Sequence, residues 1–496
     1  MGIEIFDEPA EIEQFHCDRP ISKLMMLIWQ SRKDFQNTFD LNTKAGQETF
    51  INWYDVTVNR KHRLNALKPW LSRASQWLPV AVRNKAKYAW FRVMAKGVRV
   101  TSGSAHSLER QVQQVETKLG STELQFYGGD PGVNLIGYAH AELGLGEHVR
   151  KSAAALSTTD VPFGVVDFGA GTVSRQQALL DHGLLIDSNK HKVNLFHLTA
   201  DQIFPVYLHL GRNFFERRYN IGYPFWELSK FPLEWIPPMQ LMDEVWAPTT
   251  YIQKALSDAL GKDVLYMPVG VALPKISQLG RNHFGIPEDQ YTFFFAFDFL
   301  SFIVRKNPYA VVAAFKKAFP LGNEKAGLIM KAMNAKESSD SWKRLVHDIG
   351  RDKRIRLINE TMDKATLLSF KSECDCYISL HRAEGLGLGP LEAMLLGKPV
   401  IVTNYSGNTD YAKLDNSCLV DYTLIPVQEG QYLFHENQVW ADPDIEHAAW
   451  HMKRLANDPE FGIALGKKAA VFVAANFSPA YCGQLYKRRL QELGML

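Results

Sequence analysis

The sequence predicts an α/β protein made of two doubly wound domains, with a helical extension in front of them. At 496 residues, 46% of them apolar and 22% charged, the chain is too long for one core and ordinary for a globular protein. From about residue 121, short apolar strands alternate with helical segments, which is the rhythm of a parallel sheet covered by helices. A stretch rich in proline and glycine, ALPKISQLGRNHFGIPEDQ, interrupts this alternation, and a second series follows it.

We therefore divide the chain into three parts. Residues 1–120 form a helical, basic extension, residues 121–272 a first Rossmann-like domain, and residues 273–496 a second Rossmann-like domain with closing C-terminal helices. We expect a ligand cleft between the two domains. The strands expected in the first domain lie in PGVNLIG, KVNLF, YNIGYPF, DEVWAPT and DVLYMPVGV. Those expected in the second lie in YTFFFAFDFL, AGLIMKAM, RIRLIN, CDCYISLH and PVIVT, with helices from Pro308 to about Phe319 and near 390–396.

The extension contains a strongly basic segment. Residues 56–108 carry eleven lysines and arginines and no acidic residue, while the rest of the chain has 45 basic and 53 acidic residues. If 80–96 is one helix, its apolar residues fall on one arc flanked by Arg83, Lys85 and Lys96, which is typical of a helix lying on an anionic membrane surface. A helix packed on the next domain, with its lysines in water, explains the pattern equally well. No recognition motif accompanies the charge, so we expect no nucleic-acid partner.

The cysteines and the N-terminus favour a cytoplasmic location, with peripheral attachment to the inner face of the membrane as an addition. The five cysteines are Cys17, Cys374, Cys376, Cys418 and Cys482, and their spacing is neither that of a disulfide framework nor that of a zinc site. We expect the second and third of them, in CDCYISL, to be buried by a strand. The N-terminus lacks the features of a signal peptide, and no apolar run approaches the ~18 residues that span a bilayer.

The most informative stretch is HRAEGLGLGPLEAMLLGKPV at residues 381–400. Pro390 suits the first position of a helix, and Gly397 suits the position after its last turn. The glycine-rich loop therefore leads directly into the N-terminus of a helix. Such an end offers N–H groups to an anion or to hydroxyl oxygens. Glu392 would then lie in the first helical turn as an ionised carboxylate. Glu384 follows a strand, at the sheet edge where open α/β folds bind ligands.

A simpler interpretation gives Glu392 only a helix-start role and makes the glycines only a tight connection. Two glutamates eight residues apart occur often by chance. The alternate glycines and the strand, loop and helix setting nevertheless favour a binding site.

At this point the residues resemble a known family. HRAEGLGLGPLEAMLLGKPVIVTNYSGNTDY is similar to the donor-binding segment of retaining GT4-type glycosyltransferases, also called glycosyl transferases group 1, which have the two-domain GT-B fold. The resemblance covers about 130–480. It implies that Glu384 contacts hydroxyls of the donor sugar and that Glu392 holds the nucleotide ribose. It also implies that the backbone between them contacts the sugar, through Gly385, Leu386, Gly387, Leu388 and Gly389.

Two further segments resemble diphosphate-binding parts of the family. In FDFLSFIVRKNPYAVVAAF, Lys306 with Arg305 beside it is the candidate for neutralising the donor diphosphate, because a fixed cation stabilises the charge of the leaving group. Many relatives carry another arginine just after the strand, where this chain has Asp298. In AELGLGEHVRKSAAAL, the glycine loop implicates Gly144 and Gly146. A nicotinamide site would need a third glycine where this chain has valine, which argues against a dehydrogenase.

The acceptor side is expected in the first domain. Many relatives place a histidine near the sugar at the end of a later strand; in NLFHLTADQ that position corresponds to Thr199, with His197 and Asp201 close by. A lone strand histidine is more often a core group. Beyond the next strand, YNIGYPFWELSKFP contributes Tyr223, Trp226 and Glu227 as acceptor contacts, although the tryptophan suits a core equally well.

The resemblance implies transfer of a sugar, with retention, from a UDP- or GDP-sugar to a glycan or lipid-linked glycan in bacterial surface or exopolysaccharide synthesis. It requires no cofactor and no metal, and we interpret the DPD at 442–444 as a surface feature in a polar loop. Two alternatives remain open: a sugar-nucleotide epimerase or hydrolase on the same fold, and a non-catalytic subunit of a polysaccharide assembly complex. Intact Glu384, Glu392 and Lys306 argue against the second.

Overall fold

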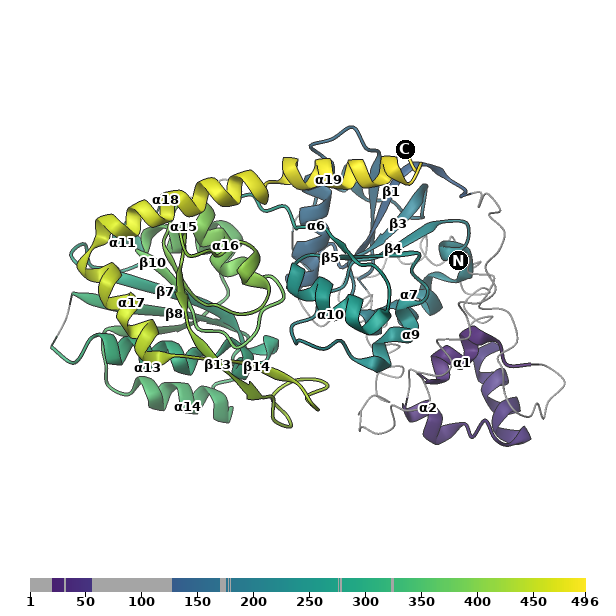
Figure 1. Cartoon of the computed structure of the whole chain (residues 1–496), viewed down its shortest axis with the longest axis horizontal. Coiled ribbons are helices and arrows are strands. Elements are labelled where there is room, and N and C mark those ends of the chain that lie inside the picture. The colour runs from purple at the N-terminus through teal and green to yellow at the C-terminus, as the bar shows by residue number, and fades with distance from the viewer. Residues whose placement is uncertain are drawn as a thin grey trace, which may run out of the picture.

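The computed structural model describes residues 20–30, 33–55, 127–169, 175–176, 178, 180–274, 276, 279–322 and 325–496. Two lobes, each built around a parallel sheet, lie side by side, and α18 and α19 run along one edge of both (Figure 1). The basic segment 56–108 and the expected helix at 80–96 lie outside the described residues. Within the residues that the structure describes, no helix is both long enough and apolar enough to cross a membrane.

The first lobe contains a six-stranded sheet with the strand order β2-β1-β3-β4-β5-β6 and parallel pairing throughout. Its strands are β1 (Asp130–Gly137), β2 (Phe163–Asp167), β3 (His191–Phe196), β4 (Tyr219–Gly222), β5 (Glu244–Ala247) and β6 (Leu265–Tyr266). Its helices are α6 (Gly144–Leu156), α7 (Ala200–Leu210), α8 (Arg212–Phe215), α9 (Ile236–Met239) and α10 (Thr250–Leu260). The five strands predicted for this part of the chain are confirmed, and β2 was not predicted.

The second lobe contains a six-stranded parallel sheet with the order β12-β11-β10-β7-β8-β9. Its strands are β7 (Tyr291–Asp298), β8 (Ala326–Met333), β9 (Ile355–Asn359), β10 (Cys376–Ser379), β11 (Val400–Thr403) and β12 (Cys418–Val420). Its helices are α11 (Gly280–His283), α12 (Ile303–Lys306), α13 (Pro308–Ala318), α14 (Asp340–Ile349), α15 (Lys364–Glu373), α16 (Leu388–Leu395), α17 (Ile445–Asn457) and α18 (Pro459–Asn476). The predicted doubly wound α/β class is confirmed.

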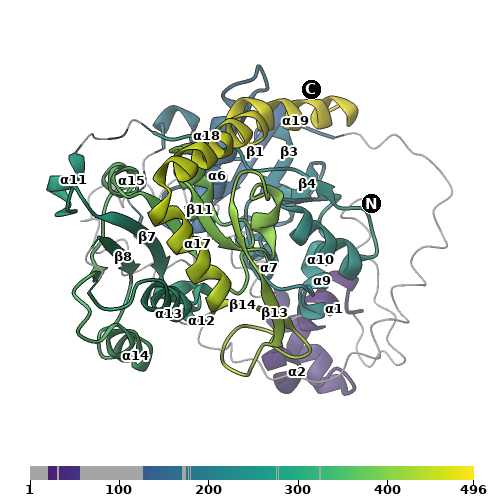
Figure 2. The same ribbon diagram turned by 60° about the vertical axis from the view of Figure 1, so that its left-hand side comes forward.

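A separate antiparallel hairpin, β13 (Tyr422–Pro426) and β14 (Val439–Pro443), extends from the second lobe toward the first (Figures 1 and 2). This hairpin was not predicted, because β13 is mostly exposed and lacks the apolar alternation of a half-buried strand.

The strand order explains where a ligand can bind. In the second sheet the order reverses between β7 and β10, which are paired neighbours although they lie far apart in the sequence. Loops diverge at such a switch point, so the carboxyl ends of the two strands frame the usual binding position of an open α/β sheet. Lys306 follows β7 and Glu384 follows β10, so the two predicted donor contacts meet there.

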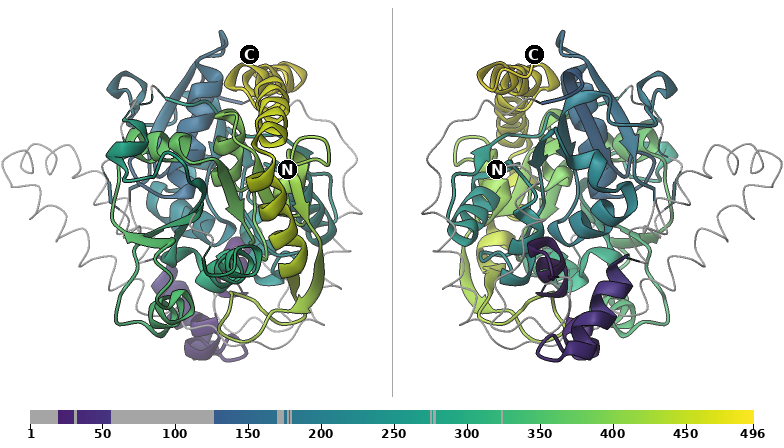
Figure 3. Two further views of the ribbon diagram at one scale, coloured as in Figure 1. Left: turned by 90° about the vertical axis from the view of Figure 1, so that its left-hand side faces the viewer. Right: turned by 90° about the vertical axis from the view of Figure 1, so that its right-hand side faces the viewer.

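The last helix returns to the first lobe. α19 (Pro479–Glu492) packs against α6, while α18 packs against α16 in the second lobe. The two C-terminal helices are seen nearly end-on in Figure 3. Gly483 permits the close crossing, because a Cβ there would meet the carbonyl oxygen of Ala155 at 2.2 Å. The predicted domain limits remain a prediction, but this helix of the 273–496 segment lies on the first lobe.

Part of the extension is helical, as expected. α1 (Lys23–Gln30) and α2 (Lys33–Thr38) are followed by a helical segment at 44–55, and α1 packs near α9 of the first lobe. Four aromatic rings form the centre of this small module: those of Phe35, Phe39, Phe50 and Trp53. Its position beside the first lobe shows that the extension is not confined to a separate tail.

The four cysteines among the described residues are free and buried. Cys376 is buried in β10 as expected, whereas Cys374 is buried at the end of α15 and not in a strand. Burial raises the pKa of Cys374 well above its ordinary value and that of Cys418 to about 12. These thiols therefore behave as small apolar side chains of the core.

Candidate functional site

A buried carboxylate lies at the switch point of the second sheet. Glu384 is only 8% exposed. Its Oε1 accepts a hydrogen bond from Lys306 Nζ at 2.5 Å, and its Oε2 accepts one from an Arg305 guanidinium nitrogen at 3.1 Å. The three side chains to which the sequence resemblance assigned the donor sugar and diphosphate are thus brought together.

The charge state of this cluster follows from its surroundings. Burial alone would raise the pKa of Glu384, but the charges of Lys306 and Arg305 outweigh it and lower the pKa to about 2. Burial lowers the pKa of Lys306 despite the attraction of the carboxylate. The glutamate is therefore an ionised hydrogen-bond acceptor at neutral pH.

Arg305 and Lys306 have different surroundings. The Arg305 guanidinium is buried, donates to the carbonyl oxygen of Ala383 at 2.9 Å, and has Glu227 of the first lobe as a second anionic neighbour at 3.8 Å. The Lys306 side chain is 20% exposed. Lys306 is thus the cation that a diphosphate could reach, whereas Arg305 is occupied by the carboxylates of Glu384 and Glu227.

Asp298, which stands where relatives often have an arginine, has a structural role. Its Oδ1 accepts a hydrogen bond from the backbone N–H of Leu300 at 2.9 Å and from the side-chain amide of Asn334 at 2.9 Å. It therefore shapes the turn after β7, and its carboxylate is engaged by neutral donors.

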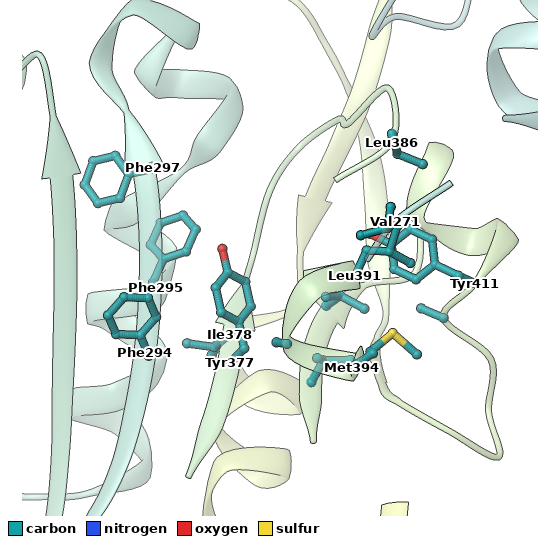
Figure 4. Packing of buried hydrophobic residues seen from close by; sticks show 14 of the residues in the cluster. Val271, Phe294, Phe295, Phe297, Tyr377, Ile378, Leu386, Leu391, Met394 and Tyr411 are labelled. Atoms are coloured by element: carbon teal, nitrogen blue, oxygen red, sulfur yellow. The ribbon is translucent and has the colours of Figure 1, made fainter. Parts of the chain in front are cut away.

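Each glycine in the turn after Glu384 is matched by a protein neighbour. A Cβ at Gly387 would meet the hydroxyl of Tyr411 at 2.6 Å, and one at Gly389 would meet the hydroxyl of Tyr377 at 2.2 Å. Gly387 also has φ +82°, which is strained for other residues. Figure 4 shows Tyr377 between the phenylalanines of β7 and helix α16, and Tyr411 beside Leu391. Gly387 and Gly389 are thus required because tyrosine hydroxyls occupy the space that their side chains would need.

Gly385 is packed against the first lobe. A Cβ there would lie 3.1 Å from the Phe225 ring, and its carbonyl oxygen accepts a hydrogen bond from the Thr249 hydroxyl at 3.0 Å. The start of the turn is therefore part of the contact between the lobes.

A second turn holds the backbone of Glu384. Its N–H donates to the hydroxyl of Ser406 at 2.8 Å, and its carbonyl oxygen accepts from the N–H of Gly407 at 2.9 Å. A Cβ at Gly407 would lie 1.9 Å from the carbonyl oxygen of Gly385, so only glycine fits. The SGN triplet was part of the family-like stretch, but sequence reasoning gave it no role.

The turn retains free donors. Within the described residues, the backbone N–H groups of Gly385, Leu386 and Gly387 have no hydrogen-bond acceptor in the protein. They precede α16, whose N-terminal end adds a favourable dipole for oxygen atoms or anions. This is the backbone surface that the glycine pattern predicted.

The predicted start of α16 was wrong by two residues. The helix begins at Leu388, with Gly387 as its N-cap, so Pro390 is its third residue and Glu392 lies in the second turn. Gly397 follows the helix with φ +72°, as expected for a helix end. Glu392 therefore owes its ionised state to other groups than the helix N-terminus.

Those groups are lysines of α15, which the sequence did not reveal. Glu392 is 3% exposed; its Oε2 lies 2.9 Å from Lys371 Nζ, and its Oε1 accepts a hydrogen bond from Lys364 Nζ. Burial alone would raise the pKa of Glu392, but Lys371, Lys364 and Lys151 lower it to about 2. Lys371 is fully buried, whereas the Lys364 side chain is 38% exposed.

The helix that follows the glycine loop of the first lobe brings a lysine near this second carboxylate. Gly144 and Gly146 open α6, and Lys151, two turns along the same helix, is close enough to Glu392 to affect its pKa. Arg150 supports the loop by donating to the carbonyl oxygens of Ala139 at 2.6 Å and Ala141 at 3.1 Å. A Cβ at Gly146 would meet the latter oxygen at 2.1 Å, whereas Gly144 faces open space.

The expected acceptor residues separate into two groups. Tyr223 and Trp226 are core residues at 0% and 2% exposure, and their polar atoms bond to carbonyl oxygens, so they are not available to an acceptor. Thr199 holds the N-cap position of α7 without a capping side-chain hydrogen bond, and Asp201 is exposed in the first turn of that helix. Glu227 is joined to the second lobe through Arg305 and Tyr432. The structure thus corrects the acceptor prediction for the two aromatic residues.

His197 is also a core residue. It is fully buried, its Nε2 lies 2.8 Å from the Ser152 hydroxyl, and burial lowers its pKa to about 3. Its ring packs on that of His148, with centroids 4.6 Å apart. It is therefore a neutral packing group.

The sequence suggested that the DPD triplet at 442–444 lies in a polar loop, and this prediction was wrong. Asp442 belongs to β14 and binds Arg382 at 2.8 Å, and Asp444 caps α17. Both carboxylates have structural partners. Among the described residues, no three histidine, cysteine or acidic side chains are grouped to hold a metal ion.

A first prediction concerns Glu392. Glu392→Gln should lower the Tm at pH 7, with a loss of about 3 kcal/mol in the free energy of unfolding, because Lys371 loses its buried counter-charge. The glutamate pKa is near 2 when folded and about 4.3 when unfolded, so its stabilisation is complete above the higher value and is lost as the pH falls toward the lower. The Tm difference between wild type and variant, followed by calorimetry, should therefore shrink from pH 6 to pH 3.

The exposed Glu360 provides the control, since Glu360→Gln should leave the Tm nearly unchanged throughout. A Glu392→Gln difference that stays constant between pH 6 and pH 3 would contradict the assignment of an ionised, paired carboxylate.

A second prediction separates the two glycines of the first-lobe loop. Gly146→Ala should destabilise the protein by about 2 kcal/mol, because the added methyl group must displace the Ala141 carbonyl. Gly144→Ala should keep the wild-type Tm, because nothing lies within 4 Å of its Cβ position. Equal Tm values for the two variants would show that the loop is packed differently.

The chain was compared with known proteins. Residues 285–471 match the family model described as glycosyl transferases group 1. No curated protein matches the sequence significantly.

Among solved structures, the fold is similar to HepE of Anabaena in complex with UDP and glucose, at 14% identity and a TM-score of 0.54, over 73% of this chain and 99% of that one. It is also similar to a glycosyltransferase of Rickettsia africae, at 12% identity and a TM-score of 0.52, over 74% and 99% of the two chains. A third similar structure is the N-terminal domain of Candida albicans trehalose-6-phosphate phosphatase, at 11% identity and a TM-score of 0.50, over 75% of this chain and 98% of that one. At these identities the similarity concerns the fold. The chain therefore has the two-domain GT-B fold, and its residues 285–471 match the family model of glycosyl transferases group 1.

Proposed function

We propose that this protein is a retaining glycosyltransferase of the GT4 type that moves a sugar from a UDP- or GDP-sugar to a glycan or lipid-linked glycan, in the synthesis of a bacterial surface polysaccharide or exopolysaccharide. One observation carries the proposal. Two ionised, buried glutamates flank a turn with free N–H groups at the switch point of the second sheet: Glu384 precedes the turn, and Glu392 follows it in α16.

The two glutamates suit two parts of a nucleotide sugar, the sugar and the ribose. Glu384 offers acceptor oxygens to sugar hydroxyls, and Lys306, partly exposed beside it, offers a cation to the diphosphate. Glu392 offers acceptor oxygens to the ribose, and its contact with Lys364 is the exposed one that a ribose can displace. The free N–H groups between them suit diphosphate or sugar oxygens.

The proposed reaction needs two further contributions from the protein: stabilisation of the leaving group and positioning of the acceptor. As the bond between the anomeric carbon and the diphosphate breaks, Lys306 and the N–H groups stabilise the charge on the departing oxygen. The acceptor hydroxyl enters on the same face, and the departing phosphate takes its proton. Holding the donor and the acceptor hydroxyl close together on that one face of the sugar supplies the rest of the rate. The proposal includes neither metal nor cofactor.

The decisive test begins with the donor. Purified protein should show a raised Tm with one nucleotide sugar among UDP- and GDP-sugars, starting with UDP-glucose, because HepE has been crystallised with it. With that donor and a glycan acceptor, Glu384→Gln should lower turnover about a hundredfold, since Lys306 and the sugar lose their shared carboxylate.

The exposed Asp415 supplies the control, and Asp415→Asn should keep the wild-type rate. Unchanged turnover of Glu384→Gln would exclude the proposed site. Nucleotide release that does not depend on an added acceptor would instead identify an epimerase or hydrolase.

The same proposal places the protein at the cytoplasmic face of a membrane, where a lipid-linked acceptor would lie. Its support is the sequence of residues 56–108, with eleven basic and no acidic residues. We expect sedimentation with anionic liposomes at low salt and release at high salt, because the attraction is screened. Absent binding, or binding that persists after deletion of 56–108, would contradict this attachment.

A further inference from the structure

The hairpin β13–β14 joins the two lobes at the edge opposite the C-terminal helices (Figures 1 and 2). Its connecting segment, residues 427–438, rests on the part of the first lobe that follows β4. Gln438 exchanges two hydrogen bonds with the Lys230 backbone, at 3.1 Å and 2.6 Å. The Phe434 ring packs edge-on against that of Trp235, with centroids 5.3 Å apart.

The two backbone crossings between the lobes lie together, away from the hairpin. The chain enters the second lobe after β6 and returns to the first between α18 and α19. At these crossings the N–H of Val271 donates to the carbonyl oxygen of Phe477 at 2.7 Å. Adjacent crossings act as a hinge, since the lobes can rotate about them while the contacts at the opposite edge separate.

At that opposite edge, one residue of the hairpin binds a carboxylate of the first lobe. The Tyr432 hydroxyl donates to Glu227 Oε2 at 2.5 Å, and the tyrosine is only 8% exposed. The same ring has the Arg305 guanidinium 6.0 Å from its centroid. Its other neighbours are the rings of Trp226 at 5.8 Å and Phe302 at 4.5 Å.

Arg305 connects this contact to the donor site. One guanidinium nitrogen lies 3.8 Å from Glu227 Oε1, and another donates to Glu384 Oε2 at 3.1 Å. A single buried cation is thus shared by a carboxylate of each lobe. When the lobes separate, the first-lobe carboxylate leaves, and the guanidinium keeps only partners of its own lobe.

We propose that Glu227 and Tyr432 are positioning residues that couple closure of the two lobes to the orientation of Glu384 through the shared guanidinium of Arg305. This inference rests on the proposed function and adds a regulation of the same site. In the closed arrangement, Arg305 is held from both sides and fixes the carboxylate that receives the donor sugar. In the open arrangement, it is held from one side only.

The test compares two tyrosine hydroxyls that both join the lobes. Tyr432→Phe removes the bond to Glu227 and keeps the ring. Tyr405→Phe is the matched control, because the Tyr405 hydroxyl lies 3.2 Å from that of Tyr251 in the first lobe and contacts no carboxylate of the cluster. With the donor found by the screen, kcat/KM for the donor should fall about tenfold in Tyr432→Phe and stay within twofold of wild type in Tyr405→Phe.

A second measurement reports closure without any turnover. Dyes on Asp258→Cys of α10 and Lys343→Cys of α14, both exposed, report the separation of the lobes by energy transfer in a Cys17→Ser background. The remaining cysteines are buried and escape labelling: Cys374, Cys376, Cys418 and Cys482. Measured free and with UDP or GDP, transfer should fall in Tyr432→Phe and match wild type in Tyr405→Phe.

The outcomes are distinct. Unchanged transfer in Tyr432→Phe, or equal changes in both variants, would show that the hydroxyl only packs the hairpin. A fall in transfer without a fall in kcat/KM would separate closure from the site and overturn the coupling. If wild type turns over no nucleotide sugar, the proposed function fails, while the energy-transfer comparison still decides whether Tyr432 holds the lobes closed.

Discussion

The arrangement of this protein depends on a carboxylate that is buried and still ionised. Burying a charge is costly unless it is paired and hydrogen-bonded. Glu384 meets that condition through Lys306 and Arg305, which follow β7, while its own backbone is fixed by the turn at Ser406, which follows β11. Three loops at one edge of the sheet are therefore determined together.

The second glutamate satisfies the same condition in a different way. The cations of Glu392 come from α15 in the same lobe, and one of them, Lys371, is fully buried. The cation shared by Glu384 also reaches Glu227 in the other lobe. Glu392 is thus held by its own lobe, whereas the cation that binds Glu384 also contacts a carboxylate of the other lobe.

The sequence predicted the sheets well because their strands are nearly continuous apolar runs, as in YTFFFAFDFL and AGLIMKAM, and buried parallel strands require such runs. It also located the glycine-rich turn after Glu384, since glycines between two glutamates are an unusual local pattern. The reason for the glycines could not be read locally. Tyr377 and Tyr411 occupy the space that side chains at Gly389 and Gly387 would need, and only the fold brings them there.

The same limit applies to charge partners. Lys364 and Lys371 precede Glu392 by 28 and 21 residues, and no periodicity links positions on different elements at such distances. Trp226 shows the opposite error: its aromatic side chain suited a sugar, but the hairpin and Trp235 enclose it. Glu227, one residue further on, points to the shared arginine instead. On the proposed function, an acceptor would approach beside Glu227, where the two lobes meet, so the closure that we propose would set donor orientation and acceptor access together.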